Sequence, residues 1–178
     1  MFRRIERHEE SGLGLPYPVT LINAAEEEID ENGEQIGIRI PNLEGLAAVV
    51  VLARCLWPYD LAGAEVRFIR RVLGYTQQEL AARLVMRPET LSRWESRKED
   101  QNPSDRPVGE WADKSLRMLA ALELSSKAPG SAVDPQDITA LRIRLRDPNT
   151  WPTVVAEQVV VRTDGHRRLE WDAMPQAA

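Results

Sequence analysis

One stretch, Gly63 to Lys98, constrains the fold most, because it contains three short amphipathic segments with tight connections between them. Gly74 predicts the end of the first helix, since glycine readily adopts the left-handed conformation that follows a helix. Thr76 and Glu79 have the spacing of a capping box, which predicts the start of the second helix. Pro88 fits the first turn of a third helix. The apolar residues of the segments recur at helical spacing: Val66, Ile69 and Leu73, then Leu80, Ala81 and Leu84, then Leu91 and Trp94.

Two helices joined by so short a turn predict a helix-turn-helix, whose second helix can enter the major groove of DNA. Charge favours the same interpretation, because this stretch is basic within a chain whose net charge is −5. It contains eight basic and four acidic residues, a local net charge of about +4. The basic residues are Arg67, Arg70, Arg71, Arg83, Arg87, Arg93, Arg97 and Lys98, and the acidic ones are Glu65, Glu79, Glu89 and Glu95.

The residues Tyr75–Ala81 (YTQQELA) and Arg87–Glu95 (RPETLSRWE) resemble the Xre/Cro helix-turn-helix family. A wider pattern, Ile40–Leu46 (IPNLEGL) with Leu61–Arg70 (LAGAEVRFIR), is similar to MqsA-type antitoxins and their stand-alone regulator relatives. These resemblances imply a DNA-binding homodimer and, for the second family, a toxin protein as a further partner. MqsA-type proteins also carry an N-terminal zinc domain ligated by cysteines. The chain has one cysteine, Cys55, so we expect that domain to be absent or replaced.

Base contacts are expected from the exposed N-terminal half of the third helix. Arg87 and Arg93 can each bond guanine at two atoms, Glu89 can accept from cytosine, and Thr90 can contact a base edge or a thymine methyl. The family's pattern places Glu89 and Arg93 on the side that faces the groove. The alternatives are a solvated or phosphate-binding Arg93, and a Glu89 that only favours the helix dipole.

Phosphate contacts are expected from Gln77, which resembles the family's backbone-binding glutamine, and from Arg71, Arg97 and Lys98, each of which is otherwise merely solvated. The resemblance also implies a partly buried ion pair between Arg70 on the first helix and Glu95 on the third.

Two departures from the family pattern concern the turn before the third helix. Most members have glycine where Val85 stands, and a β-branched residue resists the left-handed conformation that this turn needs. The position before Pro88 normally carries a capping side chain, which Arg87 cannot supply. The turn is therefore expected to be strained or differently shaped.

The segments before this stretch predict a small antiparallel sheet followed by a helix. The first dozen residues are charged and aperiodic, and we expect them to be loose. Strands are predicted at 19–22 and 35–40, with Asn32-Gly33 as a hairpin turn. The acidic residues 26–31 between them indicate a solvated strand or loop, or a surface that faces a toxin or mimics DNA. Asn42 is a plausible N-cap of a very apolar helix that ends at Trp57-Pro58.

After a polar loop, residues 108–124 predict another helix that closes the helical core. Its apolar positions are Trp111, Leu116, Leu119, Ala120 and Leu122. The family resemblance implies that a helix at this place often carries the dimer contact, and Trp111 could serve either purpose. Residues 125–137 are expected to form a linker. Residues 141–146 alternate like a strand, but Ile138, Leu141 and Leu145 also fit a helix capped at Asp137, which is favoured. A second hairpin is predicted at 154–171, either paired with the N-terminal sheet or exchanged between subunits.

Catalysis is not expected. The two histidines, His8 and His166, lie near opposite ends of the chain, and no nucleotide-binding, hydrolase or metalloprotease motif is present. No metal or cofactor is expected. The chain lacks an apolar run long enough to cross a membrane and an apolar signal core, so a cytoplasmic setting is expected.

The sequence therefore predicts an α+β protein, mainly α, with four parts: an N-terminal extension with a hairpin (1–40), a helical helix-turn-helix domain (41–124, core 63–98), a linker (125–137), and a C-terminal helix and hairpin (138–178). The favoured function is a repressor that binds an inverted repeat as a homodimer, with recognition helices about one DNA turn apart. The alternatives are an antitoxin that represses its own operon, and an interaction module whose helix-turn-helix no longer binds DNA.

Overall fold

The structure, a computed structural model, describes residues 1–96, 108–147, 151–163 and 166–176. These residues form five strands, six α-helices and one short 3-10 helix, so the expected α+β class is confirmed. In chain order they are β1 Phe2–Glu10, β2 Val19–Ile29, β3 Gln35–Arg39, α1 Leu43–Cys55, α2 Gly63–Val72, α3 Gln77–Arg83, α4 Pro88–Ser96, α5 Glu110–Leu124, η1 Pro129–Ser131, α6 Pro135–Ala140, β4 Thr153–Thr163 and β5 His166–Gln176.

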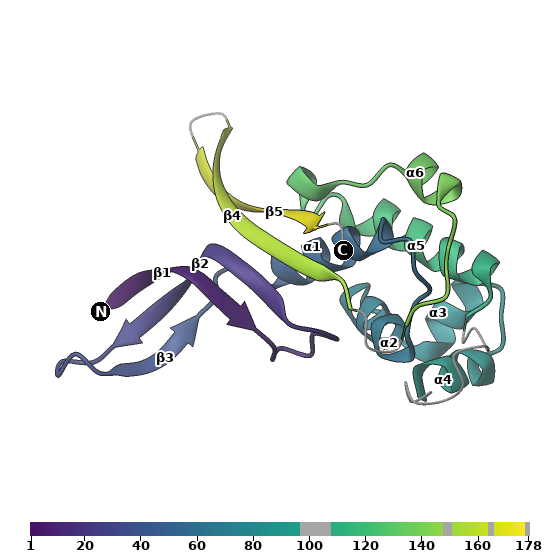
Figure 1. Cartoon of the computed structure of the whole chain (residues 1–178), viewed down its shortest axis with the longest axis horizontal. Coiled ribbons are helices and arrows are strands. Elements are labelled where there is room, and N and C mark those ends of the chain that lie inside the picture. The colour runs from purple at the N-terminus through teal and green to yellow at the C-terminus, as the bar shows by residue number, and fades with distance from the viewer. Residues whose placement is uncertain (97–107, 148–150, 164–165, 177–178) are drawn as a thin grey trace.

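The strands form one sheet in the order β1-β2-β4-β5, and β3 pairs with β2 on the same side as β4. The β2–β4 pair is parallel, with Val19 opposite Val154, and the other pairs are antiparallel. The C-terminal hairpin thus pairs with the N-terminal strands within one chain. In Figure 1 the sheet occupies the left of the molecule, and the helices gather on the right.

The expectation that the first dozen residues are loose is wrong, because residues 2–10 form β1. The strand pairs along β2, with Phe2 opposite Glu28 and Glu10 opposite Val19. β2 is also longer than predicted and includes most of the acidic residues. Arg3 Nη2 lies 2.6 Å from Glu27 Oε2 across the strands. Opposite charges on neighbouring strands let a strongly charged segment remain a strand.

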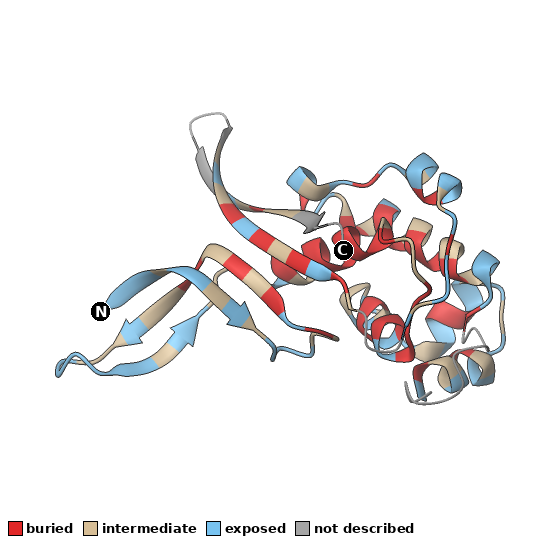
Figure 2. Cartoon of the chain, in the orientation of Figure 1, coloured by how far each residue is buried: buried red, intermediate tan, exposed pale blue. Residues whose placement is uncertain are grey.

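Helix α1 is the centre of the core. Figure 2 shows buried residues running through this helix and along the inner parts of β2 and β4. Asn42 caps the helix as predicted, since its side chain accepts a hydrogen bond from Gly45 N at 3.0 Å. On β5, the fully buried Trp171 donates from Nε1 to Asn42 O at 2.9 Å. The C-terminal hairpin is therefore attached at the start of α1.

Two buried arginines fix the connection from α1 to α2. Arg54 forms an ion pair with Glu65 at the start of α2 and donates to Asp60 O at 2.9 Å. Arg117 of α5 pairs with Asp113 and donates to Cys55 O at 3.1 Å. Both guanidinium groups are almost completely buried, and the carboxylates and carbonyls around them supply the partners that a buried charge needs. This network joins the helix-turn-helix to α1 and α5.

Helix α5 begins near the predicted position, but its exposed face differs from the expectation. Leu116 and Ala120 are buried in the core, whereas Trp111 is 78% exposed and Leu122 is also exposed. The prediction that Leu122 helps to close the core is therefore wrong. Trp111 was left open between the core and a dimer contact, and its exposure excludes the core. The inner face instead includes Asp113 and Arg117, which the periodicity of apolar residues could not indicate.

Residues 125–147 contain more structure than a linker and a single helix. The helix η1 lies against β5, where Ser131 Oγ accepts a hydrogen bond from Ala173 N at 2.9 Å. Helix α6 begins at Pro135 and is capped by Asp134 rather than Asp137. The predicted helix over 141–146 is not formed. That segment is extended and pairs with the loop after α1, where Arg144 N donates to Pro58 O at 2.9 Å.

Candidate nucleic-acid interface

The start of α3 carries the predicted capping box. Thr76 Oγ1 accepts a hydrogen bond from Glu79 N at 3.2 Å, and Glu79 Oε2 accepts one from Thr76 N at 2.8 Å. Gly74 has a φ of 78°, in the left-handed region that its sequence position predicts. These local interactions set the direction in which α3 leaves α2.

The turn between α3 and α4 keeps the left-handed conformation despite its valine. Val85 has a φ of 53° and is 93% exposed, so no packing of its own side chain offsets the strain. The turn is closed by Met86 N, which donates to Ala81 O at 2.9 Å, and by Val85 N, which donates to Ala82 O at 3.2 Å. Of the two outcomes expected for a turn with valine at this position, strained or differently shaped, the structure has the strained one, with Val85 in the left-handed conformation.

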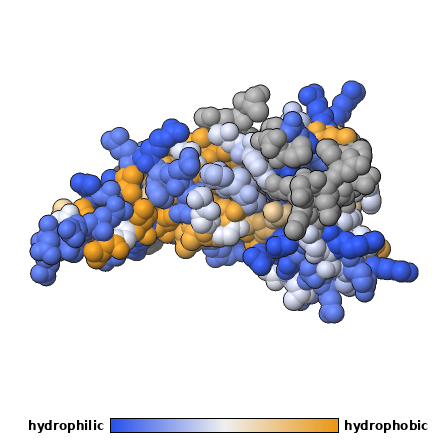
Figure 3. Space-filling view, turned by 60° about the horizontal axis from the view of Figure 1, so that its bottom comes forward, coloured by the Kyte–Doolittle hydropathy of each residue, from blue (hydrophilic) through white to orange (hydrophobic). Residues whose placement is uncertain are grey.

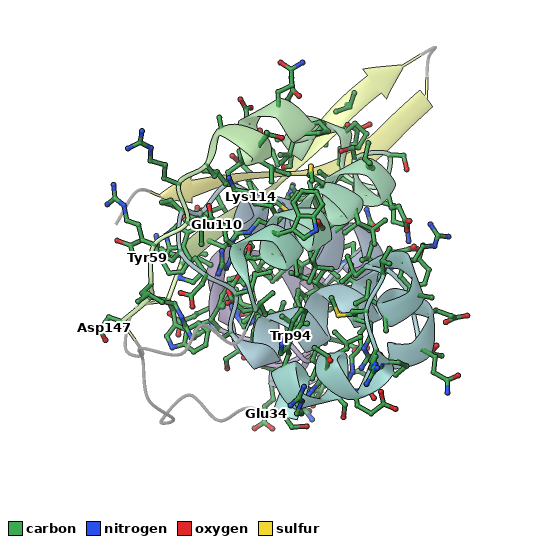
Figure 4. All side chains as sticks on the ribbon, turned by 90° about the vertical axis from the view of Figure 1, so that its right-hand side faces the viewer. Glu34, Tyr59, Trp94, Glu110, Lys114 and Asp147 are labelled. Carbon is green, nitrogen blue, oxygen red and sulfur yellow. The ribbon has the colours of Figure 1, made fainter. Side chains whose placement is uncertain are left out.

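Helix α4 has an inner face that packs against the core and an outer face that is exposed to solvent. Leu91 and Glu95 are buried, and Trp94 is half-buried against the core. Three of the predicted base-contacting residues lie on the rest of the helix surface, and Arg87 directly precedes the helix. Arg87, Glu89 and Arg93 are exposed and Thr90 is half-buried. Residues 89, 90 and 93 share one side of an α-helix, so the structure brings these side chains together. In Figure 4, Trp94 lies among the helices in the lower part of the view, below Glu110 and Lys114 of α5.

Glu95 joins all three helices of the motif. Its carboxylate accepts hydrogen bonds from Arg70 Nε at 2.6 Å and Arg70 Nη2 at 2.9 Å, which forms the ion pair that the resemblance implied. Gln77 Nε2 also donates to it at 2.9 Å. Burial opposes the ionisation of Glu95, but the hydrogen bonds from Arg70 and Gln77 and the charges of Arg70 and Arg67 outweigh it. They hold the pKa of the carboxyl below its ordinary value.

The predicted phosphate contacts differ in their surroundings. Arg71 is exposed on α2. Gln77 is half-buried and gives one amide hydrogen to Glu95, so a phosphate contact would use its second N–H. Arg97 and Lys98 lie outside the described residues.

Sequence reasoning did not find two interactions that hold the site. Arg67 donates to the backbone carbonyl of Glu95 in the last turn of α4, where a cation is favoured. Tyr75 Oη donates to Glu123 Oε1 of α5 at 2.7 Å, and Arg83 lies over the Tyr75 ring. Arg67 precedes Arg70 by one helical turn, which is a signal that it faces the same side. The position of Glu123 gave no such signal.

Comparison with protein families agrees with this geometry. Residues 66–114 match the helix-turn-helix family model, and this segment is a helix-turn-helix of the Xre/Cro type. The match covers most of α2, all of α3 and α4, and the start of α5. It supports a DNA-binding regulator. Searches of curated proteins and of solved structures found no match to the chain. In the described part of the chain, no helix is both long and apolar enough to cross a membrane.

Proposed function

We propose that this protein is a sequence-specific transcriptional repressor that binds duplex DNA through α4. The observation that carries the proposal is the division of that helix into two faces. Leu91 and Glu95 fix the inner face, the outer face presents Glu89 and Arg93 to solvent, and Arg87 is exposed directly before the helix. The outer set combines donors suited to guanine with an acceptor suited to cytosine. A helix held this firmly can place those groups against base edges with little loss of conformational freedom.

The proposed assembly is a homodimer in the cytoplasm that binds an inverted repeat and represses by occluding a promoter. Two-fold symmetry of the protein matches two-fold symmetry of the site, and the half-site spacing follows from the surface that joins the copies. We assign the protein no catalytic activity, no cofactor and no metal.

The proposal is tested by selecting DNA fragments that the purified protein binds from a genomic library, with its own promoter included. We expect a fragment containing an inverted repeat to be enriched, and a reporter behind that fragment to be repressed when the protein is expressed. Enrichment of fragments without a common sequence would contradict the repressor and leave an interaction module with a helix-turn-helix that does not read DNA.

A second candidate, an antitoxin that also represses its own operon, is favoured by one surface. Ile36 and Ile38 alternate on β3, so they share a face of the sheet, and they are 62% and 45% exposed. Figure 3 shows hydrophobic residues at the left-hand end of the molecule, which β1, β2 and β3 form (Figure 1). The acidic residues nearby are less suited to mimic DNA, because Glu27 is paired with Arg3. The test is whether co-expression of this protein neutralises the toxicity of the product of an adjacent gene. The double variant Ile36→Asp/Ile38→Asp should lose this protection. It should still bind the operator, because the changed residues lie on β3 and not on α4.

A further inference from the structure

Strand β1 forms a long free edge of the sheet. Among the described residues its pairing partner is β2 alone, along its whole length. The irregularity in this pair lies in β2, because Ile5 and Arg7 face Ala25 and Ile22, so the extra residue belongs to β2. β1 itself is therefore regular. By contrast, β3 is shorter, and the outer strand β5 contacts η1.

The two ends of β1 carry opposite charges. Arg3 and Arg4 stand near its start and Glu9 and Glu10 stand at its end, while Glu6 and Arg7 in the middle run in the reverse order, and all six side chains are exposed or half-buried. Edge strands often carry charges that discourage pairing with other chains. A strand of one charge sign would repel a copy of itself in every orientation. In the parallel, in-register orientation every charge of β1 meets its own sign, whereas in an antiparallel pair the two ends meet opposite charges and only the residue on the two-fold axis meets its own sign.

We propose that β1 pairs antiparallel with β1 of a second copy of this chain. A two-fold axis through Glu6 places Arg3 opposite Glu9 of the partner subunit. An axis through Arg7, the next register that symmetry allows, places Arg4 opposite Glu10 of the partner subunit. In both registers the two ends of each strand meet opposite charges, and cross-strand pairs of opposite charge stabilise a sheet. The residue on the axis, Glu6 or Arg7, meets its own copy, and this one like-charge pair offsets part of the gain from the two Arg–Glu pairs. The interface uses one edge of each copy and closes at two copies.

This dimer has a consequence for the DNA site. β1 lies in the left half of the molecule in Figure 1, whereas α4 lies at the right-hand end of the long axis. Copies joined through β1 therefore hold their recognition helices far apart, and the half-sites are separated by more than the single DNA turn expected from the sequence. The consequence for DNA rests on the proposed function. The pairing itself does not, since it is measured without DNA.

The test uses two charge variants of the full chain, and mass in solution is measured by light scattering and sedimentation. Arg3→Glu/Arg4→Glu makes β1 acidic at both ends, and Glu9→Arg/Glu10→Arg makes it basic at both ends. The second variant leaves Arg3 and its ion pair with Glu27 intact. Circular dichroism and thermal unfolding of each variant show whether the fold is retained.

We expect the wild-type protein to have twice the chain mass of 20.1 kDa. At the same concentration, each variant alone should have the mass of one chain. An equal mixture of the two variants should recover the doubled mass. The mixture restores pairing because an acidic strand then faces a basic one. A wild-type monomer, a variant that remains a dimer, or a mixture that stays monomeric would each overturn the proposal. DNA binding by the monomeric variants is measured separately, so failure of dimerisation and failure of α4 to bind DNA are distinguished.

Discussion

At the scale of single residues, the strain at Val85 makes a direct prediction. A non-glycine residue in the left-handed region costs on the order of 1–3 kcal/mol, and the valine side chain is exposed. Val85→Gly should raise the free energy of unfolding by about 1 kcal/mol, after the greater freedom of glycine in the unfolded chain is subtracted. Val85→Ala is the control. It keeps a Cβ atom and should recover less. Chemical denaturation measures both, and a glycine variant no more stable than the alanine variant would show that the turn is not strained.

The buried carboxylate of Glu95 predicts a pH-dependent difference in stability. Glu95→Gln leaves Arg70 without its counter-charge and should lower the free energy of unfolding at pH 7 by about 2 kcal/mol. The pKa of Glu95 is lower in the folded protein than its ordinary value of 4.5. The wild-type advantage is therefore complete above about 4.5 and is lost as the pH falls through the folded-state pKa.

The measurement is urea unfolding of both proteins from pH 7 to pH 3. Asp30, Glu44 and Glu79 also have lowered pKa values, so the wild-type protein alone does not isolate Glu95. The difference between the two proteins does. A difference that stays constant over this range would show that Glu95 does not ionise differently in the folded and unfolded states.

Single residues also show which interactions could be predicted from the sequence and which could not. The ion pair Arg70–Glu95 was available from a family resemblance, because both residues lie in the matching motif. The buried ion pair Arg54–Glu65 was not, since Arg54 sits in an apolar run and its role depends on carbonyls from a loop. Leu122 was expected in the core from its place in the apolar pattern, although the chain leaves it exposed. Burial of a side chain depends on neighbours from other elements, which periodicity does not report.

At the scale of elements, those defined by local interactions were predictable and those defined by distant pairing were not. Helix α3 begins at a capping box and α1 begins at a capping asparagine, and both signals lie within a few residues of the helix start. β1 carries few apolar residues and is stabilised by its register with β2. Residues 141–146 fit a helix or a strand by pattern, and contacts with the loop around Pro58 and Asp60 make them extended.

The junction of α1 with β5 predicts an unusual sign for a helix substitution. Replacing a glycine within a helix by alanine is normally stabilising by roughly 0.5–1 kcal/mol. A Cβ atom at Gly45, however, would lie 2.5 Å from Asn42 Nδ2 and 2.7 Å from Trp171 Cδ1. Gly45→Ala should therefore destabilise the protein by roughly 1–3 kcal/mol, as measured by thermal unfolding.

A second variant separates the steric effect from a general effect on the helix. In a chain that already carries Trp171→Ala, the cost of Gly45→Ala should fall by about 1 kcal/mol, because one of the two clashes is removed. Strict additivity of the two substitutions would mean that β5 does not pack closely on the start of α1.

At the scale of the whole molecule, the sheet and the helix-turn-helix share one core. Buried residues of β2, β4 and β5 belong to the same cluster as those of α1, α2 and α4. The two terminal hairpins were each predictable, but their union into one sheet was left open, because a parallel pair between strands so distant in the chain has no local signal. The two proposed functional surfaces are also far apart in space. α4 lies at one end of the long axis and β3 lies at the other (Figure 1).

That separation supplies a matched control for the central claim, which is that α4 reads DNA sequence. The measurement is the affinity for a selected DNA fragment and for bulk DNA, across a salt series, of the wild-type protein, Arg93→Ala and Arg39→Ala. Both variants lose one exposed positive charge, from α4 and from β3 respectively. We predict that the wild-type protein prefers the selected fragment by at least about a thousand-fold.

Arg93→Ala should reduce binding to the selected fragment by roughly 10- to 100-fold, the loss of one bidentate base contact, and should change binding to bulk DNA little. Arg39→Ala should leave the preference unchanged. Binding that is weak, independent of sequence and abolished by moderate salt reports phosphate contacts alone. That result, or an equal effect of the two variants, would contradict the assignment of α4 as a recognition helix.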